Sequence, residues 1–137
     1  MHPILAVLDT NILVSALISK DGIPALIYDM VHDGKLIPFY SDGIIHEYKA
    51  VLYRPRLMIL PSKVDALLML FVMMGKKVIP KQSTIAMPDE SDRKFYDAAT
   101  TQGIILITGN KKHFPAEPHI LSPREFYQIS KTPCSFF

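Results

Sequence analysis

The amino-acid sequence predicts an α/β fold, a three-layer α/β/α sandwich with a central parallel sheet. Short apolar runs of strand length recur along the chain, and segments with helical features lie between them. Strands that alternate with helices need crossover connections, which place helices on both faces of a parallel sheet. Because 137 residues at 49% hydrophobic suffice for one core, we expect a single domain over residues 1–137, with a short C-terminal tail from about residue 130.

The elements are expected in the following order. Strands are predicted at the apolar runs Ile4–Leu8, Leu36–Tyr40, Lys77–Ile79, Ile104–Ile107 and His119–Leu121. Helices are predicted at Asn11–Ile18, Pro24–His32, Asp42–Leu52, Ser62–Met74, Ser91–Thr101 and Pro123–Gln128. Pro24 and Pro123 suit the first turns of their helices, and Ser62 and Ser122 suit the N-cap positions that precede or open a helix.

Composition excludes several classes of protein. The net charge of +2 neither requires nor excludes a nucleic-acid partner, because local clustering matters more than the sum. Cys134 is the only cysteine, which rules out an intrachain disulfide and a cysteine-based zinc site. The start of the chain lacks the features of a signal peptide, and the longest apolar run, "VDALLMLFVMM", is shorter than the roughly 20 residues of a membrane span. We therefore expect a cytoplasmic protein with no membrane partner.

Polar residues follow the predicted strands at the points where the strands end. Asp9 ends the first strand, Glu47 lies in the helix after the second, Asp92 opens the fifth helix, and Asn110 follows the fourth strand in "TGN". In a parallel sheet these strand ends lie at one edge. Three carboxylates in one crevice repel one another unless a hard cation such as Mg²⁺ or Mn²⁺ lies between them. The pattern therefore predicts a metal site.

Each of these residues also has a purely structural interpretation, which the sequence leaves open. Asp9 or Thr10 would serve as a helix N-cap. Glu47 would be a solvated helical residue paired with a neighbouring lysine, and Asp92 would interact with the dipole of its helix. The segment that contains Asn110 would be a simple turn.

Four blocks of the sequence resemble the PIN domain family, a group of metal-dependent ribonucleases. They are "AVLDTNILVSAL", "SDGIIHEYKAVLYRPRL", "PDESDRKFYDAA" and "ILITGNKKHFP". The resemblance implies that Asp9, Glu47 and Asp92 occupy the three acidic metal positions of the family, and that Asn110 occupies a fourth that is often Asp. It also implies that Asp89 is an accessory acidic residue and that the same crevice is lined by Thr10, Asn11 and Thr108.

The resemblance further implies an activity and partners. Among PIN proteins the chain is most similar to VapC-like toxins of toxin–antitoxin pairs. The implied function is a Mg²⁺- or Mn²⁺-dependent endoribonuclease that cleaves single-stranded or looped RNA, forms a homodimer and is inhibited by a small antitoxin protein. Candidate phosphate contacts beside the crevice are Arg54, Arg56, Lys111 and Lys112, although plain solubilising charge explains each of them equally well.

Other enzyme classes do not match the sequence. There is no Gly-x-Gly-x-x-Gly after the first strand and no P-loop, and Asn11 stands where a phosphoaspartyl enzyme of the haloacid dehalogenase kind needs a second Asp. The remaining alternative is a PIN-like module that binds RNA or a protein without cutting, which the amide at Asn110 keeps open. His113 has no second histidine at metal-binding spacing, so we expect a structural or RNA-proximal role for it. The stripe "ALLMLFVMM" is expected to be core or dimer surface.

Overall fold

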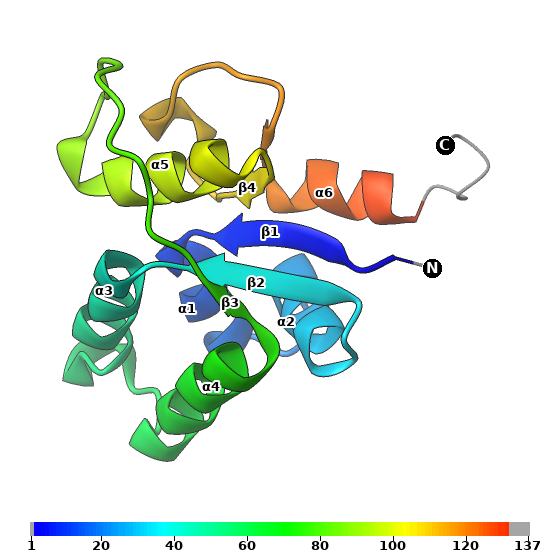
Figure 1. Cartoon of the computed structure of the whole chain (residues 1–137). Coiled ribbons are helices and arrows are strands. Elements are labelled where there is room, and N and C mark those ends of the chain that lie inside the picture. The colour runs from blue at the N-terminus through cyan, green and yellow to red at the C-terminus, as the bar shows by residue number, and fades with distance from the viewer. Residues whose placement is uncertain (1, 132–137) are drawn as a thin grey trace.

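The computed structural model describes residues 2–131 and confirms the predicted fold class. Five strands form one parallel sheet in the order β3-β2-β1-β4-β5, with β1 in the centre (Figure 1). The strands are β1 (Ile4–Leu8), β2 (Leu36–Tyr40), β3 (Lys76–Lys77), β4 (Ile105–Ile107) and β5 (Ile120–Leu121). Because all the strands are parallel, their carboxyl ends meet at one edge of the sheet.

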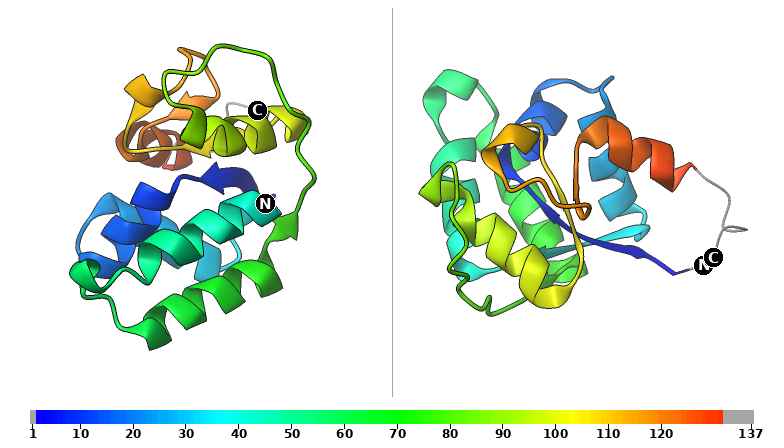
Figure 2. Two further views of the ribbon diagram at one scale, coloured as in Figure 1. Left: turned by 90° about the vertical axis from the view of Figure 1, so that its left-hand side faces the viewer. Right: turned by 90° about the horizontal axis from the view of Figure 1, so that it is seen from above.

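Helices cover both faces of this sheet (Figure 2). The α-helices are α1 (Thr10–Ile18), α2 (Ile23–His32), α3 (Asp42–Leu52), α4 (Pro61–Met74), α5 (Arg93–Gln102) and α6 (Pro123–Ser130). Short 3₁₀ turns are η1 (Pro55–Leu57), η2 (Glu90–Asp92) and η3 (Lys111–His113). Helices α1 to α4 lie on one side, α5 packs across β1, β2 and β4 from the other side, and α6 packs against α2 and β5.

The carboxyl-terminal parts of the central strands β1 and β4 are buried on both faces, which explains their apolar sequence up to the strand ends. Ala6, Val7 and Leu8 of β1 have no exposed surface, and neither have Leu106 and Ile107 of β4. A strand covered by helices on both sides has no solvent face and so does not alternate between apolar and polar residues. The first polar residues, Asp9 and Thr108, therefore come directly after the last residues of these two strands.

Tyr48 of α3 connects the helices to the end of the central strand. Its ring is fully buried and lies edge-on to Phe71 of α4 at 5.7 Å between ring centroids, with Phe95 of α5 at 6.4 Å. Its hydroxyl donates a hydrogen bond of 2.5 Å to the backbone carbonyl of Leu8. Because a buried carbonyl needs a donor, this bond fixes α3 against the carboxyl end of β1, one residue from Asp9 on the strand and one residue from Glu47 on the helix.

Several predicted element boundaries differ from those in the structure. Ser62 is not an N-cap, since α4 begins one residue earlier with Pro61 at its first position and Leu60 before it. Proline is favoured there because the first helical N–H has no partner within the helix. Ser122 is an N-cap as predicted, and it forms a capping box with Glu125.

The fifth predicted helix is divided in two. A 3₁₀ turn covers Glu90–Asp92, and α5 begins only at Arg93 and ends at Gln102. Gly103 follows with a φ of +66°, a left-handed conformation that glycine adopts without strain and that ends the helix. Strand β3 is also shorter than predicted, because the chain leaves the sheet after the amide of Val78 donates to the carbonyl of Tyr40.

The methionine-rich helix α4 is only half buried. Leu67 and Phe71 lie in the core, whereas Met69, Val72 and Met73 are more than half exposed. The expectation for this stripe is core or dimer surface, and one face of the helix is core. The opposite face presents apolar side chains to solvent.

Two further expectations concern the C-terminal tail and the possibility of a membrane-spanning helix. Cys134 and the tail from residue 132 onward lie outside the described residues. Within residues 2–131 no single helix has the length and apolar composition to cross a membrane. Helices α1 and α2 have that length and composition only when they are counted together, and they are bent by 98° relative to each other.

Tyr48→Phe is expected to lower the free energy of unfolding by about 1–2 kcal/mol, because it leaves the buried Leu8 carbonyl without its donor. The measurement is urea unfolding of the metal-free protein. Tyr53→Phe is the matched control, since the Tyr53 hydroxyl bonds to Asp65 at the surface. Equal losses for the two variants would contradict a special role for the Tyr48 hydroxyl.

Candidate active site

Asp9 lies at the carboxyl end of β1 and is almost completely buried. Its side chain is 6% exposed and accepts hydrogen bonds from the Thr108 hydroxyl at 2.7 Å and from the Asn11 amide at 3.4 Å. Asp9 occupies the N-cap position of α1 but makes no capping hydrogen bond with its side chain. Helix capping therefore does not account for this carboxylate.

Glu47 projects from α3 toward the same strand end, and both of its carboxylate oxygens have partners. The Thr10 hydroxyl donates to Oε2 at 2.5 Å, and the Lys94 ammonium donates to Oε1 at 2.7 Å. The sequence left open a pairing with a neighbouring lysine. The lysine in the structure comes instead from α5, on the opposite side of the sheet, so Glu47 is directed into the molecule.

Asp92 lies at the start of α5, close to Asp89 and His113. The His113 Nδ1 is 3.5 Å from the Asp92 Oδ2, and ligand atoms of the three side chains all lie within 4.8 Å of one another. From the sequence, His113 is expected to have a structural or RNA-proximal role, because no second histidine stands at metal-binding spacing. The structure gives it two carboxylate neighbours from a distant segment, so these three residues are a group that has the donors to hold a metal ion.

The segment before α5 is held in place by Arg93. Its guanidinium donates to the backbone carbonyls of Ser83 at 3.0 Å and Ile85 at 2.7 Å and pairs with Glu90 at 2.6 Å. Asp89 accepts from the Ser91 amide at 3.0 Å and so caps η2. These contacts fix the turn that presents Asp92.

The turn after β4 is tied directly to the acidic residues. Thr108 is fully buried, donates to Asp9 and accepts from the Asn110 amide at 3.0 Å. The Gly109 amide donates to the Asn11 side chain at 3.1 Å. The segment is a turn, but its hydrogen bonds orient Asp9 and Asn11 and make it part of the site.

These residues surround one pocket of about 380 Å³ at the carboxyl edge of the sheet. Figure 2, left, looks onto this edge, with α5 above and α3 below. Of the residues predicted for the site, those that line the pocket are Asp9, Thr10, Asn11, Glu47, Arg54, Arg56, Asp92 and Asn110.

The other four predicted residues are not part of the pocket wall. Thr108 lies behind Asp9, and Asp89 lies beside Asp92. Lys111 is paired with Glu125 of α6 at 2.9 Å, and Lys112 is exposed in the same turn, η3. The two arginines are therefore better placed than the two lysines to contact a molecule in the pocket.

The charged forms of these carboxylates are destabilised by burial and by the negative charges of their neighbours. Burial raises the pKa of Asp9 from 3.8 to about 6, and the nearby charges of Asp92 and Glu47 add to the rise, while the hydrogen bond from Thr108 opposes it. Burial also raises the pKa of Asp92, with a further contribution from Asp89. A divalent cation among these oxygens would relieve this repulsion, and carboxylate oxygens are the ligands that Mg²⁺ and Mn²⁺ prefer.

The role of Lys94 is not evident from the sequence. Its only sequence signal is that it follows Asp92 by two positions, which does not distinguish it from a solvated lysine. Its contact with Glu47 joins residues 47 positions apart. Such a contact follows from the packing of α5 beside α3, which no local pattern encodes.

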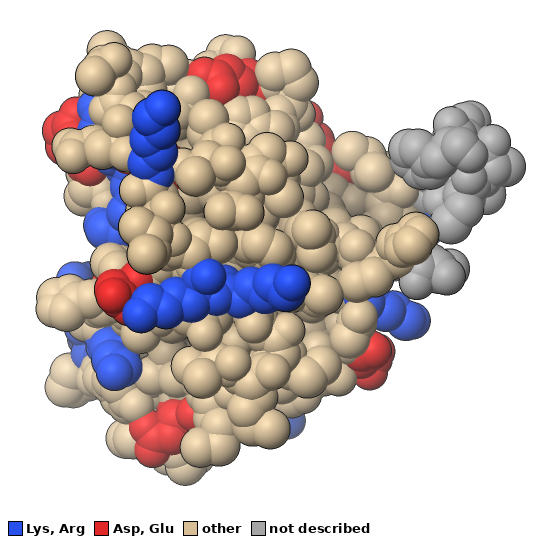
Figure 3. Space-filling model, in the orientation of Figure 1, with Lys and Arg blue, Asp and Glu red and all other residues tan. Residues whose placement is uncertain are grey.

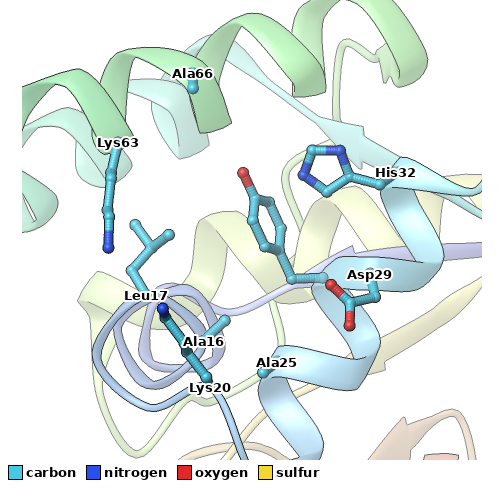
Figure 4. A pocket seen from close by; sticks show the side chains of 9 residues that line it. Ala16, Leu17, Lys20, Ala25, Asp29, His32, Lys63 and Ala66 are labelled. Carbon is cyan, nitrogen blue, oxygen red and sulfur yellow. The ribbon is translucent and has the colours of Figure 1, made fainter.

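A second pocket, of about 450 Å³, lies between α1, α2 and α4 (Figure 4). Among the described residues that line it, Asp29 is the single carboxylate, and Lys20, His32 and Lys63 are the basic ones. It therefore lacks the acidic cluster of the pocket at the sheet edge. On the face seen in Figure 3, Lys and Arg side chains do not merge into one broad patch.

Comparisons with known proteins give a family match and a similar protein. The family model of the PIN domain matches residues 5–112. An uncharacterized protein of Methanocaldococcus jannaschii is 31% identical over 108 residues, which cover 77% of this chain and 70% of that protein. The family match extends from β1 into η3 and includes every residue that lines the acidic pocket except His113.

Asp9→Asn is expected to stabilise the metal-free protein at pH 7.5. Between pH 3.8 and about 6 the folded state holds more protons than the unfolded state, so stability falls as the pH rises through this window. At about 1.4 kcal/mol per pH unit the ionised carboxylate costs about 3 kcal/mol above pH 6. Asparagine removes the charge and keeps an oxygen for Thr108.

The measurement is urea unfolding in EDTA at pH 4.5, 6 and 7.5. The gain from Asp9→Asn should be small at pH 4.5 and about 1–3 kcal/mol at pH 7.5. The surface variant Asp33→Asn serves as the control and should change little at any of these pH values. A variant less stable than wild type at pH 7.5 would contradict the assigned strain.

Proposed function

The chain belongs to the PIN domain family, and we propose that it is a Mg²⁺- or Mn²⁺-dependent endoribonuclease. PIN domains are in general metal-dependent nucleases. The observation that carries the proposal is the convergence of Asp9, Glu47 and Asp92, from three separate elements, on one pocket at the carboxyl edge of the sheet. Burial of a carboxylate beside two others is costly unless a cation shares the site.

In the proposed mechanism Asp9, Glu47 and Asp92 would hold the cation, and the side-chain amide of Asn110 would offer a neutral oxygen. When bound, Mg²⁺ or Mn²⁺ polarises the scissile phosphate, lowers the pKa of a water and stabilises the leaving 3′-oxygen. The hydroxyls of Thr10 and Thr108 orient Glu47 and Asp9 through the hydrogen bonds of 2.5 and 2.7 Å.

The protein side of the mechanism also has to bind the RNA. Arg54 and Arg56 are at the pocket wall and would bind the phosphates that flank the scissile bond. The fork of a guanidinium suits the oxygens of a phosphate. Lys111 and Lys112 would contact the RNA at points farther from the pocket.

We further propose a biological role as the VapC-like toxin of a toxin–antitoxin pair in the cytoplasm. A small antitoxin protein would obstruct the acidic pocket, and the product of cleavage would carry a 5′-phosphate. The exposed apolar face of α4, with Met69, Val72 and Met73, supports association into a homodimer.

A second candidate is a PIN module that binds RNA or a protein partner without cutting it. Two observations favour it: an amide at Asn110 in place of a fourth carboxylate, and an ammonium already paired with Glu47. Both lower the negative charge available to a metal. A metal-dependence assay separates the two functions.

Purified protein is expected to cleave single-stranded RNA in the presence of Mg²⁺ or Mn²⁺ and not in EDTA. Asp9→Asn and Asp92→Asn should each remove the activity, because each removes a charge and a strong ligand from the metal site. Circular dichroism and thermal unfolding establish that the variants are folded. Asp33→Asn is the matched control and should cleave like wild type. Cleavage that persists in EDTA would overturn the metal-dependent mechanism.

Arg54→Gln and Arg56→Gln, each made in an Asp92→Asn background to prevent cleavage, are expected to weaken RNA binding for all sequences alike. Loss of one phosphate contact should reduce the slope of log K against log salt by about 0.7. Binding is measured by fluorescence anisotropy between 50 and 300 mM KCl. Lys77→Gln is the control, since Lys77 pairs with Asp42 outside the pocket wall. A slope unchanged in both arginine variants would count against phosphate contacts in the pocket.

A further inference from the structure

Lys94 places a positive charge next to Glu47, which lines the acidic pocket. Its ammonium is 2.7 Å from the Glu47 Oε1 and donates to the Ser91 carbonyl at 2.5 Å. The side chain is 30% exposed and that of Glu47 is 23% exposed, so water screens the pair only in part. Such a contact differs from a surface ion pair, whose two charges are free to separate.

Each carboxylate oxygen of Glu47 accepts a hydrogen bond from another side chain of the protein. Lys94 occupies Oε1, and the Thr10 hydroxyl occupies Oε2. A divalent cation that uses Glu47 must therefore either displace Lys94 or approach within a few ångströms of its positive charge. Both arrangements set the binding of the cation against the position of the ammonium.

The surroundings explain why a lysine is stable in this position. Asp9 and Asp92 line the same pocket as Glu47, and the negative charge of Glu47 acts on both of them. An ammonium beside Glu47 offsets part of this repulsion while no metal is bound. The same charge becomes unfavourable once a cation with two positive charges takes over that role.

We propose that Lys94 is a positioning residue that serves as an internal counter-ion of the metal site: it holds Glu47 in the metal-free protein and leaves it when a divalent cation binds. This inference rests on the metal site of the proposed function. By reciprocity, a cation that displaces the ammonium is bound more weakly because of it. Lys94 thus sets the concentration of divalent cation at which the site fills.

The test compares wild type with Lys94→Met, which keeps the length of the side chain and removes its charge, and with Lys94→Arg, which keeps the charge. MnCl₂ is titrated into each full-length protein by isothermal calorimetry. Lys94→Met is expected to bind Mn²⁺ on the order of tenfold more tightly than wild type, whereas Lys94→Arg should bind like wild type. Lys77→Met is the control, because it removes an ammonium from an ion pair with Asp42 outside the pocket.

Thermal unfolding supplies a second readout that does not depend on activity. In EDTA, Lys94→Met should unfold at a lower temperature than wild type, because Glu47 loses its counter-ion. In saturating Mn²⁺ the difference should vanish or change sign. A purely structural role would lower the unfolding temperature of Lys94→Met by the same amount with and without the metal. That result would overturn the proposal.

The outcomes also separate this proposal from the proposed function. Mn²⁺ binding by wild type with equal or weaker binding by Lys94→Met would refute the role of Lys94 and leave the metal site intact. No Mn²⁺ binding by wild type or by any variant would refute both. If Lys94→Met fails to fold, Lys94→Gln is titrated in its place, with the same expected result.

Discussion

The parallel pairing of β1 with β4 is the constraint on which the candidate site depends. Leu8 lies opposite Ile107, and the Asp9 amide donates to the Ile107 carbonyl at 3.0 Å. This register places the first polar residue after each strand side by side, so that Thr108 reaches the carboxylate of Asp9. A shift by one residue would turn each of these side chains to the opposite face of the sheet. Helices α1 and α3 and the 3₁₀ turns η1, η2 and η3 then bring most of the remaining residues of the pocket to this fixed pair.

The unfavourable part of this arrangement is the buried, negatively charged carboxylate of Asp9 at the end of the core. Asp9 is enclosed by apolar strands and by other acids, and its stabilising contacts are neutral hydroxyl and amide groups. The burial of Tyr48 and its bond to Leu8 show that the same strand end is otherwise well packed. Proteins keep such locally unfavourable groups where a ligand uses them, and the rest of the core supplies the stability that they remove.

How far the sequence predicts the fold and the site depends on the range of the contacts involved. The predicted bounds of β1, β2 and α3 are those of the structure, because buried apolar runs and the helical segment that follows the second of them are local signals. The start of α5 and the cap of α4 were misplaced, since Pro61 and the Arg93 contacts outweigh the serines nearby. Local patterns also placed Asp9 after a strand, Asp92 at the start of a helix and Glu47 within the helix that follows the second strand. They gave no sign of the contacts of Glu47 with Lys94 or of Asp92 with His113, which arise only when distant elements pack.

The order of the strands in the sheet also determines when the site is assembled during synthesis. Asp9 is made early, but its partner Thr108 follows 99 residues later, and between them the chain must complete β2, β3 and α5. The central strand therefore lacks one of its two neighbours until the segment around Thr108 has left the ribosome. Contacts of such long range form late and slowly in folding. A nascent chain that carries Asp9, Glu47 and Asp92 without β4 has no assembled pocket, so any chemistry performed there is withheld until the segment from β4 to Asn110 has left the ribosome.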